Sequence, residues 1–110
     1  MYVVMNRIPV HPDFSEAFEE RFRRRAGAVD RMPGFIRTMV LRPENGDDPY
    51  VVLTMWESKE HYIAWTQSEA FQQGHARTGR LPQEAYRGPS RLEAFTTVVD
   101  SAQAEEAGDA

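Results

Sequence analysis

The chain has 110 residues and no cysteine, with 41% hydrophobic residues, 27% charged residues and a formal net charge of −4 at pH 7. This length and composition fit one ordinary globular domain, and the missing cysteines exclude disulfides, thiolate nucleophiles and iron–sulfur ligation. The negative charge argues against nucleic acid as a partner. Because no apolar stretch is long enough to cross a membrane and no signal-like segment is seen, we expect a cytoplasmic protein without a membrane partner.

The first part of the chain has a strand-type pattern followed by a helix-type pattern. Residues 2–10 are rich in β-branched and apolar side chains and predict a strand. Asp13, with Glu16 three residues later, predicts the N-terminus of a helix. Apolar residues at helical spacing extend this helix to about Arg31, before Pro33-Gly34.

The middle of the chain predicts a β-hairpin. Residues 35–42 and residues 50–56 both read as strands. Between them, Asn45-Gly46 lies at the centre of a polar segment that is typical of a hairpin turn. We therefore expect these two strands to pair in antiparallel fashion.

The remainder predicts short helices, a loop and a last strand. Ser58 is a suitable N-cap for a helix through Trp65, and Ser68 for a further helix. Residues 77–90 contain several glycines and prolines and predict a long loop. Residues 91–99 predict the last strand.

The element order β-α-β-β-α-β predicts an α+β fold of the ferredoxin-like, split βαβ type (a dimeric α+β barrel), with an antiparallel sheet and helices on one face. Residues 1–100 would form this domain, and residues 101–110 a disordered acidic tail. The strands carry apolar residues on both faces, such as Val3 and Met5 on one and Val4 on the other. Because two helices cover only one face, we expect a homodimer in which a second copy covers the other.

Asn6 interrupts the apolar pattern of the first strand. Side chains alternate along a strand, so Asn6 shares a face with Val4 and Ile8 and is the polar member of that set. One interpretation is an edge or bulge position where the amide bonds to the backbone. The other is a buried amide that uses a ligand atom as its hydrogen-bond partner. The residue pattern leaves both open.

His75 is the histidine that a ligand site would most plausibly use. His11 lies in a turn and His61 on a charged helix, so both are expected to be solvated. His75 follows Phe71 by four residues, which places the two on one helix face. Gly74 removes a side chain where a planar ligand would approach. A lone histidine is nevertheless more often a satisfied surface or core residue than a ligand, and both interpretations stand.

Aromatic and basic residues give a further set of candidates. Trp56 ends an alternating strand and is expected in the core, whereas Trp65 ends a helix and could either pack or line a pocket. Phe22 and Arg25 are three residues apart on one helix. An aromatic ring beside a guanidinium could stack on a macrocycle and pair with its carboxylate. The arginine run otherwise predicts a solvated helix face.

With these residues identified, the chain resembles the antibiotic-biosynthesis-monooxygenase (ABM) domain, and more specifically its IsdG-type heme-degrading monooxygenases. The resemblance covers roughly residues 2–99 and rests on the set Asn6, Trp65 and His75. It also rests on four segments, Pro33-Gly34-Phe35, Val52-Leu53-Thr54-Met55-Trp56-Glu57-Ser58, Ala64-Trp65 and Phe71-Gln72-Gln73-Gly74-His75. The segments mark the broad family, and the three single residues favour heme degradation.

The resemblance implies a role for each residue. Heme would be both substrate and oxygen activator, used with O2 and an external electron donor such as a reductase. His75 would be the axial ligand to the heme iron, with its neutral imidazole. Asn6 would hydrogen-bond the oxygen that is being activated, and Trp65 would press the porphyrin out of plane. Phe22 and Arg25 would line the heme pocket.

Two other functions remain open at this point. A cofactor-independent ABM-type oxygenase of a polyphenolic substrate would share the fold and the dimer but would not need His75 as an iron ligand. A heme-storage or heme-transfer protein would use the same pocket without turnover. Asn6, Trp65 and His75 together favour a heme protein over the first alternative, but they do not separate degradation from storage.

Overall fold

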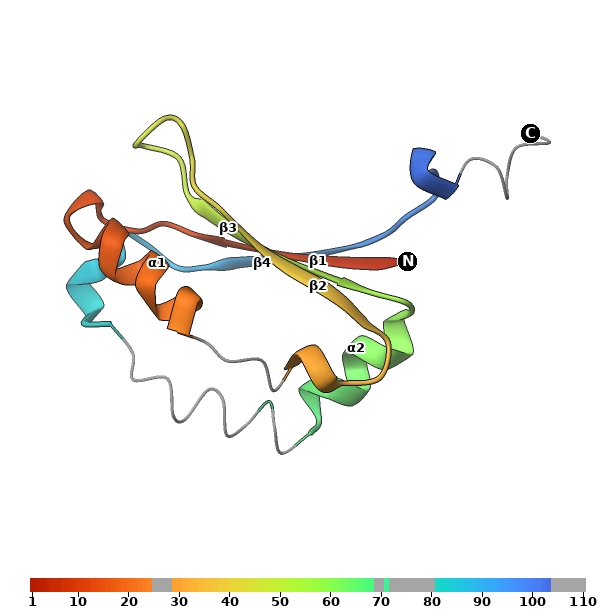
Figure 1. The fold of residues 1–110 in the computed structure, drawn as a ribbon. Coiled ribbons are helices and arrows are strands. Elements are labelled where there is room, and N and C mark those ends of the chain that lie inside the picture. Colours follow the sequence, from red (N-terminus) through yellow and green to blue (C-terminus); the bar gives the residue numbers. More distant parts are fainter. Residues whose placement is uncertain (25–28, 69–70, 72–80, 104–110) are drawn as a thin grey trace.

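The computed structural model describes residues 1–24, 29–68, 71 and 81–103. Its strands and helices are β1 (Tyr2–Ile8), α1 (Ser15–Arg24), β2 (Phe35–Leu41), β3 (Tyr50–Trp56), α2 (Lys59–Thr66) and β4 (Arg91–Thr96). Short 3-10 turns lie at η1 (Pro12–Phe14), η2 (Val29–Arg31), η3 (Gln83–Ala85) and η4 (Ser101–Gln103). The strands form one antiparallel sheet in the order β2-β3-β1-β4, and both helices lie on one side of it (Figure 1), which confirms the predicted ferredoxin-like fold.

The central position of β1 explains its apolar character on both faces. It pairs with β3 on one side and with β4 on the other, so that Val4 faces Thr54 and Ala94. A strand in the middle of a sheet has no free edge, and on each face its side chains lie between those of β3 and β4. β1 ends at Ile8 rather than at Val10, because Pro9 has no N–H for the ladder.

The start of the first helix differs from the prediction. The side chain at the N-cap is that of His11, whose Nδ1 accepts a hydrogen bond from the Asp13 backbone N–H at 3.2 Å. Asp13 lies inside the 3-10 turn and does not cap it, because Pro12 already starts the helical path. The described part of α1 ends at Arg24, and residues 25–28 lie outside the described residues. Val29–Arg31 form a 3-10 turn, η2, so the prediction of α-helix as far as residue 31 was wrong for its last turn.

The β-hairpin and the second helix were predicted closely. β3 has the expected bounds, and the Asp48 N–H donates to the Asn45 carbonyl at 3.0 Å in the turn. Ser58 caps α2 by accepting from the His61 N–H at 3.3 Å. Ser68 likewise accepts from the Phe71 N–H at 3.1 Å. The rest of the helix predicted after Ser68, and the loop up to residue 80, lie outside the described residues.

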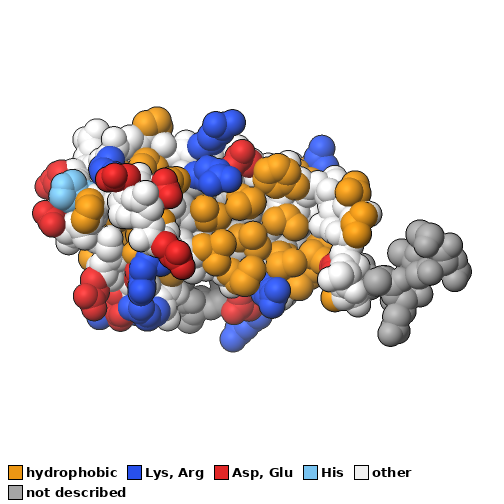
Figure 2. All heavy atoms as spheres, turned by 90° about the horizontal axis from the view of Figure 1, so that it is seen from above, with side chains coloured by type: hydrophobic (Ala, Val, Ile, Leu, Met, Phe, Trp, Pro, Cys, Tyr) orange, Lys and Arg blue, Asp and Glu red, His pale blue; other side chains and the backbone are white. Residues whose placement is uncertain are grey.

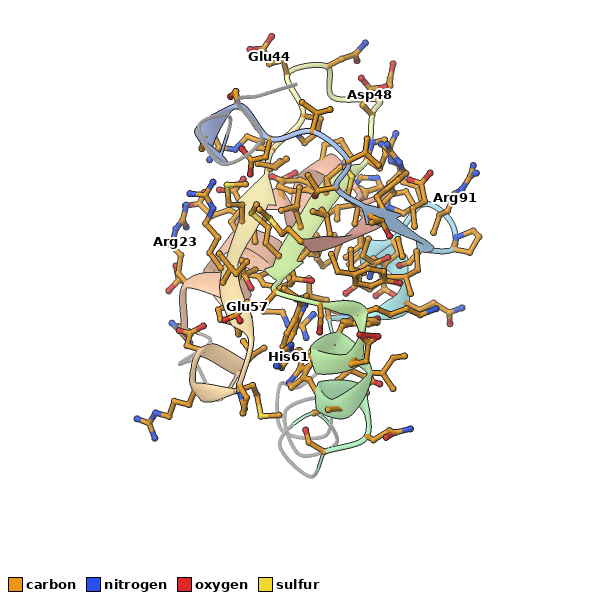
Figure 3. The ribbon with its side chains drawn as sticks, turned by 90° about the vertical axis from the view of Figure 1, so that its right-hand side faces the viewer. Arg23, Glu44, Asp48, Glu57, His61 and Arg91 are labelled. Carbon is orange, nitrogen blue, oxygen red and sulfur yellow. The ribbon has the colours of Figure 1, made fainter. Side chains whose placement is uncertain are left out.

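Gly34 and His61 together set where α2 packs. Gly34 has a φ of +79°, which side chains with a Cβ rarely adopt. A Cβ on Gly34 would also lie 2.1 Å from His61 Cγ, so the imidazole needs the space that glycine leaves. The ring is further held by the Ser58 hydroxyl, 2.7 Å from its Nδ1. His61, labelled in Figure 3, is therefore half-buried and not the solvated residue that was expected.

The core on the helix side has two ends. At the α1 end, Phe18 is 1% exposed and packs on Tyr50 with ring centroids 4.9 Å apart. At the α2 end, Trp56 is fully buried and contacts Trp65. The apolar stripe of α1 and the aromatic residues of α2 thus each bury one end of the sheet.

The opposite sheet face carries a continuous apolar surface that no described element covers (Figure 2). Its side chains alternate with those of the covered face, and we call them the open face: Val3, Met5, Met39, Leu41, Val51, Leu53, Met55 and Phe95. Phe95 and Leu41 are 46% and 42% exposed. An ion pair, Arg7 Nε to Glu93 Oε1 at 2.6 Å, lies on the same face.

The C-terminal segment leaves the sheet earlier than expected. β4 ends at Thr96, and Val98 and Val99 are 90% and 85% exposed. Strand propensity alone had extended this strand to residue 99, but the last paired residues are Tyr2 and Thr96, and the last backbone hydrogen bond joins the Thr97 N–H to the Met1 carbonyl at 2.9 Å. Residues 104–110 of the predicted tail lie outside the described residues.

Candidate functional site

Asn6 lies in the middle of the covered face. It pairs in regular register with Val52 on β3 and with Leu92 on β4, so the interpretation as an edge or bulge residue was wrong. Its neighbours on the same face, Val4 and Ile8, are 4% and 8% exposed.

The side-chain amide of Asn6 has an unsatisfied acceptor. Its Oδ1 is buried and makes no hydrogen bond to any residue that the structure describes. Leaving such a group without a partner costs about 1–3 kcal/mol. Because the oxygen and nitrogen of an amide exchange places by a half-turn about χ2, the same side chain can present either an acceptor or a donor to a ligand.

Trp65 is held by an aromatic cluster under the sheet. Its ring centroid lies 5.5 Å from that of Trp56, 6.2 Å from that of Tyr62 and 4.6 Å, edge-on, from that of Phe71. Such tilted and edge-on pairs fix ring orientation as well as burying apolar area. Trp65 is nevertheless only half-buried. Part of the indole is therefore free to meet another flat molecule.

Trp56 closes the core at this end, as expected, and has a second feature that the sequence did not indicate. Its residue exposure is 0%, and its indole Nε1 is buried with no acceptor among the described residues. Two unsatisfied polar atoms, one on Trp56 and one on Asn6, thus lie on the covered side of the same sheet. Native cores contain few such atoms, and each calls for an explanation.

Phe22 lies on the side of α1 that faces the sheet. Its ring contacts Phe18 at 5.1 Å between centroids, and it packs against the core cluster. It also lines a cavity of about 440 Å³, together with Val40 and Tyr50. The structure thus places Phe22, Asn6 and Trp65 on the helix side of the sheet. Arg25 and His75 lie outside the described residues, so their predicted roles are not tested by it.

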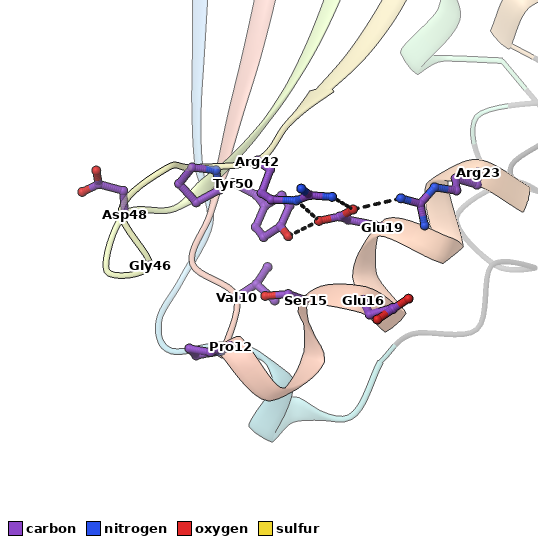
Figure 4. Close-up of a pocket in the computed structure, with 11 residues that line it drawn as sticks. Val10, Pro12, Ser15, Glu16, Glu19, Arg23, Arg42, Gly46, Asp48 and Tyr50 are labelled. Atoms are coloured by element: carbon purple, nitrogen blue, oxygen red, sulfur yellow. Dashed lines mark hydrogen bonds and ion pairs between the residues drawn. The ribbon is translucent and has the colours of Figure 1, made fainter.

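A polar cluster that sequence reasoning missed lies at the α1 end (Figure 4). Arg42 on the loop after β2 donates two hydrogen bonds to Glu19 on α1, both at 2.6 Å, and the Tyr50 hydroxyl donates to the same carboxylate. Arg23 adds an ion pair at 3.0 Å. We call Glu19, Arg42, Tyr50 and Arg23 the α1 clamp. It borders a cavity of about 340 Å³ near the hairpin turn.

The α1 clamp keeps Glu19 ionised at neutral pH. The hydrogen bonds from Arg42 and then Tyr50 lower the pKa of Glu19 from 4.5 to about 2. Burial, together with the hydrogen bond to Glu19, raises the pKa of Tyr50. A carboxylate whose lone pairs are already taken by arginine and tyrosine is a poor acid or base at neutral pH. The clamp therefore fixes α1 on the sheet and is not a catalytic pair.

Metal binding by the protein side chains alone finds no support in the described part of the chain. No group of three or more His, Asp or Glu residues with metal-binding geometry occurs there. In the same residues, no helix is both long and apolar enough to span a membrane.

Comparison with known proteins agrees with the observed fold. The family model "Antibiotic biosynthesis monooxygenase" matches residues 1–77. The chain is 38% identical over 98 residues to the heme oxygenase (mycobilin-producing) of Mycobacterium tuberculosis H37Rv, covering 89% of this chain and 90% of that protein. It is 34% identical over 88 residues to the heme oxygenase (staphylobilin-producing) of Staphylococcus haemolyticus, covering 77% and 83%.

A solved structure matches over almost the same length. It is the heme degrader MhuD from Mycobacterium tuberculosis with two hemes bound in its active site, with a TM-score of 0.73, 35% identity, and coverage of 91% of this chain and 98% of that one. The fold, the family model and the relatives agree. The chain belongs to the antibiotic biosynthesis monooxygenase family.

Proposed function

We propose that this protein is a heme-degrading monooxygenase, an oxidoreductase that opens the porphyrin ring and releases iron. The observation that carries the proposal is the buried, unsatisfied amide oxygen of Asn6 on the covered sheet face, the same face against which Trp65 packs. Relatives at 34–38% identity are named heme oxygenases. A polar atom without a protein partner is explained if the ligand supplies one.

The residues present fit heme in three ways. Trp65, half-buried and backed by Trp56, offers a flat apolar surface to a macrocycle. The Asn6 amide offers a hydrogen-bond donor or acceptor on the same covered sheet face. Phe22 adds an aromatic ring from α1. When bound, heme supplies both the carbon that is oxidised and the iron that activates O2.

Each candidate residue has a proposed task. When heme is bound, the Asn6 amide would hydrogen-bond the oxygen, and the Trp65 indole would shape the surface on which the porphyrin packs. His75 is the proposed axial ligand to the iron, and Arg25 the proposed partner of a heme carboxylate. The reaction also requires O2 and an external electron donor, for which we propose a cytoplasmic reductase. What the described residues contribute to the inner part of the site is thus placement and shape.

The test is to add hemin to the purified protein and follow the Soret band before and after ascorbate. Degradation predicts a bound Soret band that decays once the reductant is present. A band that is stable to ascorbate would indicate storage, and no bound band would favour a cofactor-independent oxygenase. His75→Ala should lose the ligated ferric spectrum, whereas the control His11→Ala, whose imidazole caps η1, should keep it.

We further propose that a second copy of the chain covers the open face. The face is apolar and continuous, and large exposed apolar patches mark interaction surfaces. Sheet-on-sheet packing of two such faces would bury Leu53 and Phe95, which point away from the helices. Sedimentation at micromolar concentration should give a dimer for the parent and a monomer for Leu53→Glu. A monomeric parent would rule this packing out.

A further inference from the structure

The aromatic residues under α2 form a connected series of oxidisable rings. Ring centroids are 5.5 Å apart for Trp65 and Trp56, 5.9 Å for Trp56 and Tyr62, and 5.8 Å for Tyr62 and Tyr2. Trp65 also contacts Tyr62 directly, without Trp56 between them, with ring centroids 6.2 Å apart. We call these four residues the aromatic series. Rings at these separations are in or near van der Waals contact.

The series runs in one direction, from the proposed site toward the end of the sheet. Trp65 is the member that is proposed to contact the ligand, and Trp56 is fully buried. Tyr2 lies at the start of β1, next to the N-terminus (Figure 1), and is half-buried. An electron vacancy that arises at Trp65 would therefore have a path of contiguous rings out of the site.

The chemical order of the rings favours movement along this path. A neutral indole radical oxidises a phenol at neutral pH, so tyrosine lies downstream of tryptophan. Burial raises the pKa of the Tyr62 phenol. Tyr62 is therefore a protonated phenol that can give up an electron and a proton together.

We propose that the aromatic series is a one-electron relay that carries oxidising equivalents from Trp65, through Trp56 and Tyr62, to Tyr2. Its function is to remove a stray radical from the ligand site before the indole of Trp65 is destroyed. The source of the oxidant rests on the proposed function, since a reaction of heme with O2 and electrons can release a one-electron oxidant beside Trp65.

The relay begins with a one-electron oxidation of Trp65. The oxidant takes one electron from the Trp65 indole, which loses its Nε1 proton to water. Tyr62 then gives one electron to the Trp65 indole, directly or by way of the Trp56 ring, which keeps its own proton, and gives its phenolic proton to water, while Trp65 Nε1 takes a proton back from water. The vacancy passes to Tyr2 by the same exchange. A soluble reductant of the ascorbate class finally returns one electron and one proton to the Tyr2 phenoxyl radical.

The relay can be tested without heme by pulse radiolysis with azide radical, which oxidises tryptophan selectively. Both tryptophans of the chain belong to the series, so every tryptophan radical starts inside it. The absorption of the indole radical should decay as that of the phenoxyl radical grows. The rate should be first-order and independent of protein concentration, because the transfer is intramolecular.

Three conservative variants decide the result, because phenylalanine keeps the ring packing. Tyr62→Phe should remove most of the intramolecular phenoxyl growth. Tyr86→Phe should match the parent, because Tyr86 contacts Arg21 and has no ring contact with the series. Tyr2→Phe should still form phenoxyl but should lose its fast reduction by ascorbate. Phenoxyl growth in Tyr62→Phe equal to that of the parent, or a rate that scales with protein concentration, would overturn the relay.

A second experiment separates the relay from the proposed function. During ascorbate-dependent reaction with hemin, peptide mass spectrometry should find more oxidised Trp65 in Tyr62→Phe than in the parent. An absence of any heme reaction would count against the proposed function, and the radiolysis result would still decide the relay. Equal Trp65 oxidation in both proteins during active turnover would show that the series does not protect the site.

Discussion

The two ends of the covered sheet face hold their helices by different kinds of interaction. At the α1 end, the Glu19 carboxylate accepts hydrogen bonds from Arg42 and Tyr50, so charge and hydrogen bonds position the helix. At the α2 end, Trp56 and Trp65 stack, and helix placement depends on ring packing. Within the α1 clamp, the Glu19 carboxylate is taken up by arginine and tyrosine and is not free for acid–base chemistry.

The middle of the face differs from both ends. There, Asn6 has an amide oxygen that nothing in the described chain satisfies. A fold that satisfies Glu19 so fully, yet leaves the Asn6 amide oxygen without a partner, gives up stability at Asn6 as it does at the Trp56 indole nitrogen. Such local costs are typical of functional positions. The comparison predicts that substitutions at the ends change stability, whereas a substitution in the middle changes function.

The largest effect on stability is expected at the α2 end. Trp56→Ala removes a fully buried indole and should lower the free energy of unfolding by about 3–5 kcal/mol. Trp56→Phe keeps a ring and also removes the unsatisfied Nε1, so it should cost clearly less. Denaturant unfolding at one fixed protein concentration measures both. Equal costs for the two variants would show that ring packing does not hold this end.

The next largest effect on stability is expected where Gly34 packs against α2. Gly34→Ala adds a Cβ at a positive φ and against the His61 ring, so it should cost about 2–3 kcal/mol. In a His61→Ala background the ring atoms at 2.1 and 2.5 Å are gone, but the Cβ of residue 61 at 2.6 Å and the backbone strain remain, so the same change should cost less, about 1–2 kcal/mol. A double-mutant cycle by denaturant unfolding gives the coupling. Additive costs would contradict the contact.

A smaller effect is expected at the α1 end and should depend on pH. The folded-state pKa of Glu19 is about 2, against an ordinary 4.5, so its stabilisation is present above pH 4.5 and is lost as pH falls toward 2. Because Arg42 is largely exposed, we expect Glu19→Gln to cost about 1–2 kcal/mol at pH 7. That difference from the parent should shrink on acidification.

Glu20→Gln is the matched control for the α1 clamp. Glu20 is on the same helix but is 46% exposed and pairs only with neighbouring arginines, so its loss should cost at most about 0.5 kcal/mol. Unfolding curves for both variants between neutral and acidic pH make the comparison. If the loss of unfolding free energy in Glu19→Gln does not change with pH, the α1 clamp does not lower the pKa of Glu19.

The features that sequence predicted well depend on neighbouring residues. The bounds of β3 follow from alternation along one strand, and the Ser58 cap follows from its position just before α2. The element order then gave the fold class. The unusual character of Asn6 was also visible, because a polar residue in an apolar row stands out without any knowledge of its partners.

The features that sequence missed depend on residues far apart in the chain. The contact of Glu19 with Arg42 joins α1 to the loop after β2, and that of Gly34 with His61 joins a turn to α2. Nothing in either local pattern indicates the partner. The ligand role of His75 came from the family resemblance rather than from spacing, and it remains a proposal.

The central claim is that Asn6 serves a ligand and not the fold, and Asn6→Val tests it most directly. Valine fits a central strand and removes the unsatisfied amide, so stability should stay within about 0.5 kcal/mol of the parent or rise. At equal heme occupancy, the rate of ascorbate-dependent heme loss should fall to a small fraction of the parent rate. An unchanged rate, or a clear loss of stability at unchanged turnover, would contradict the claim.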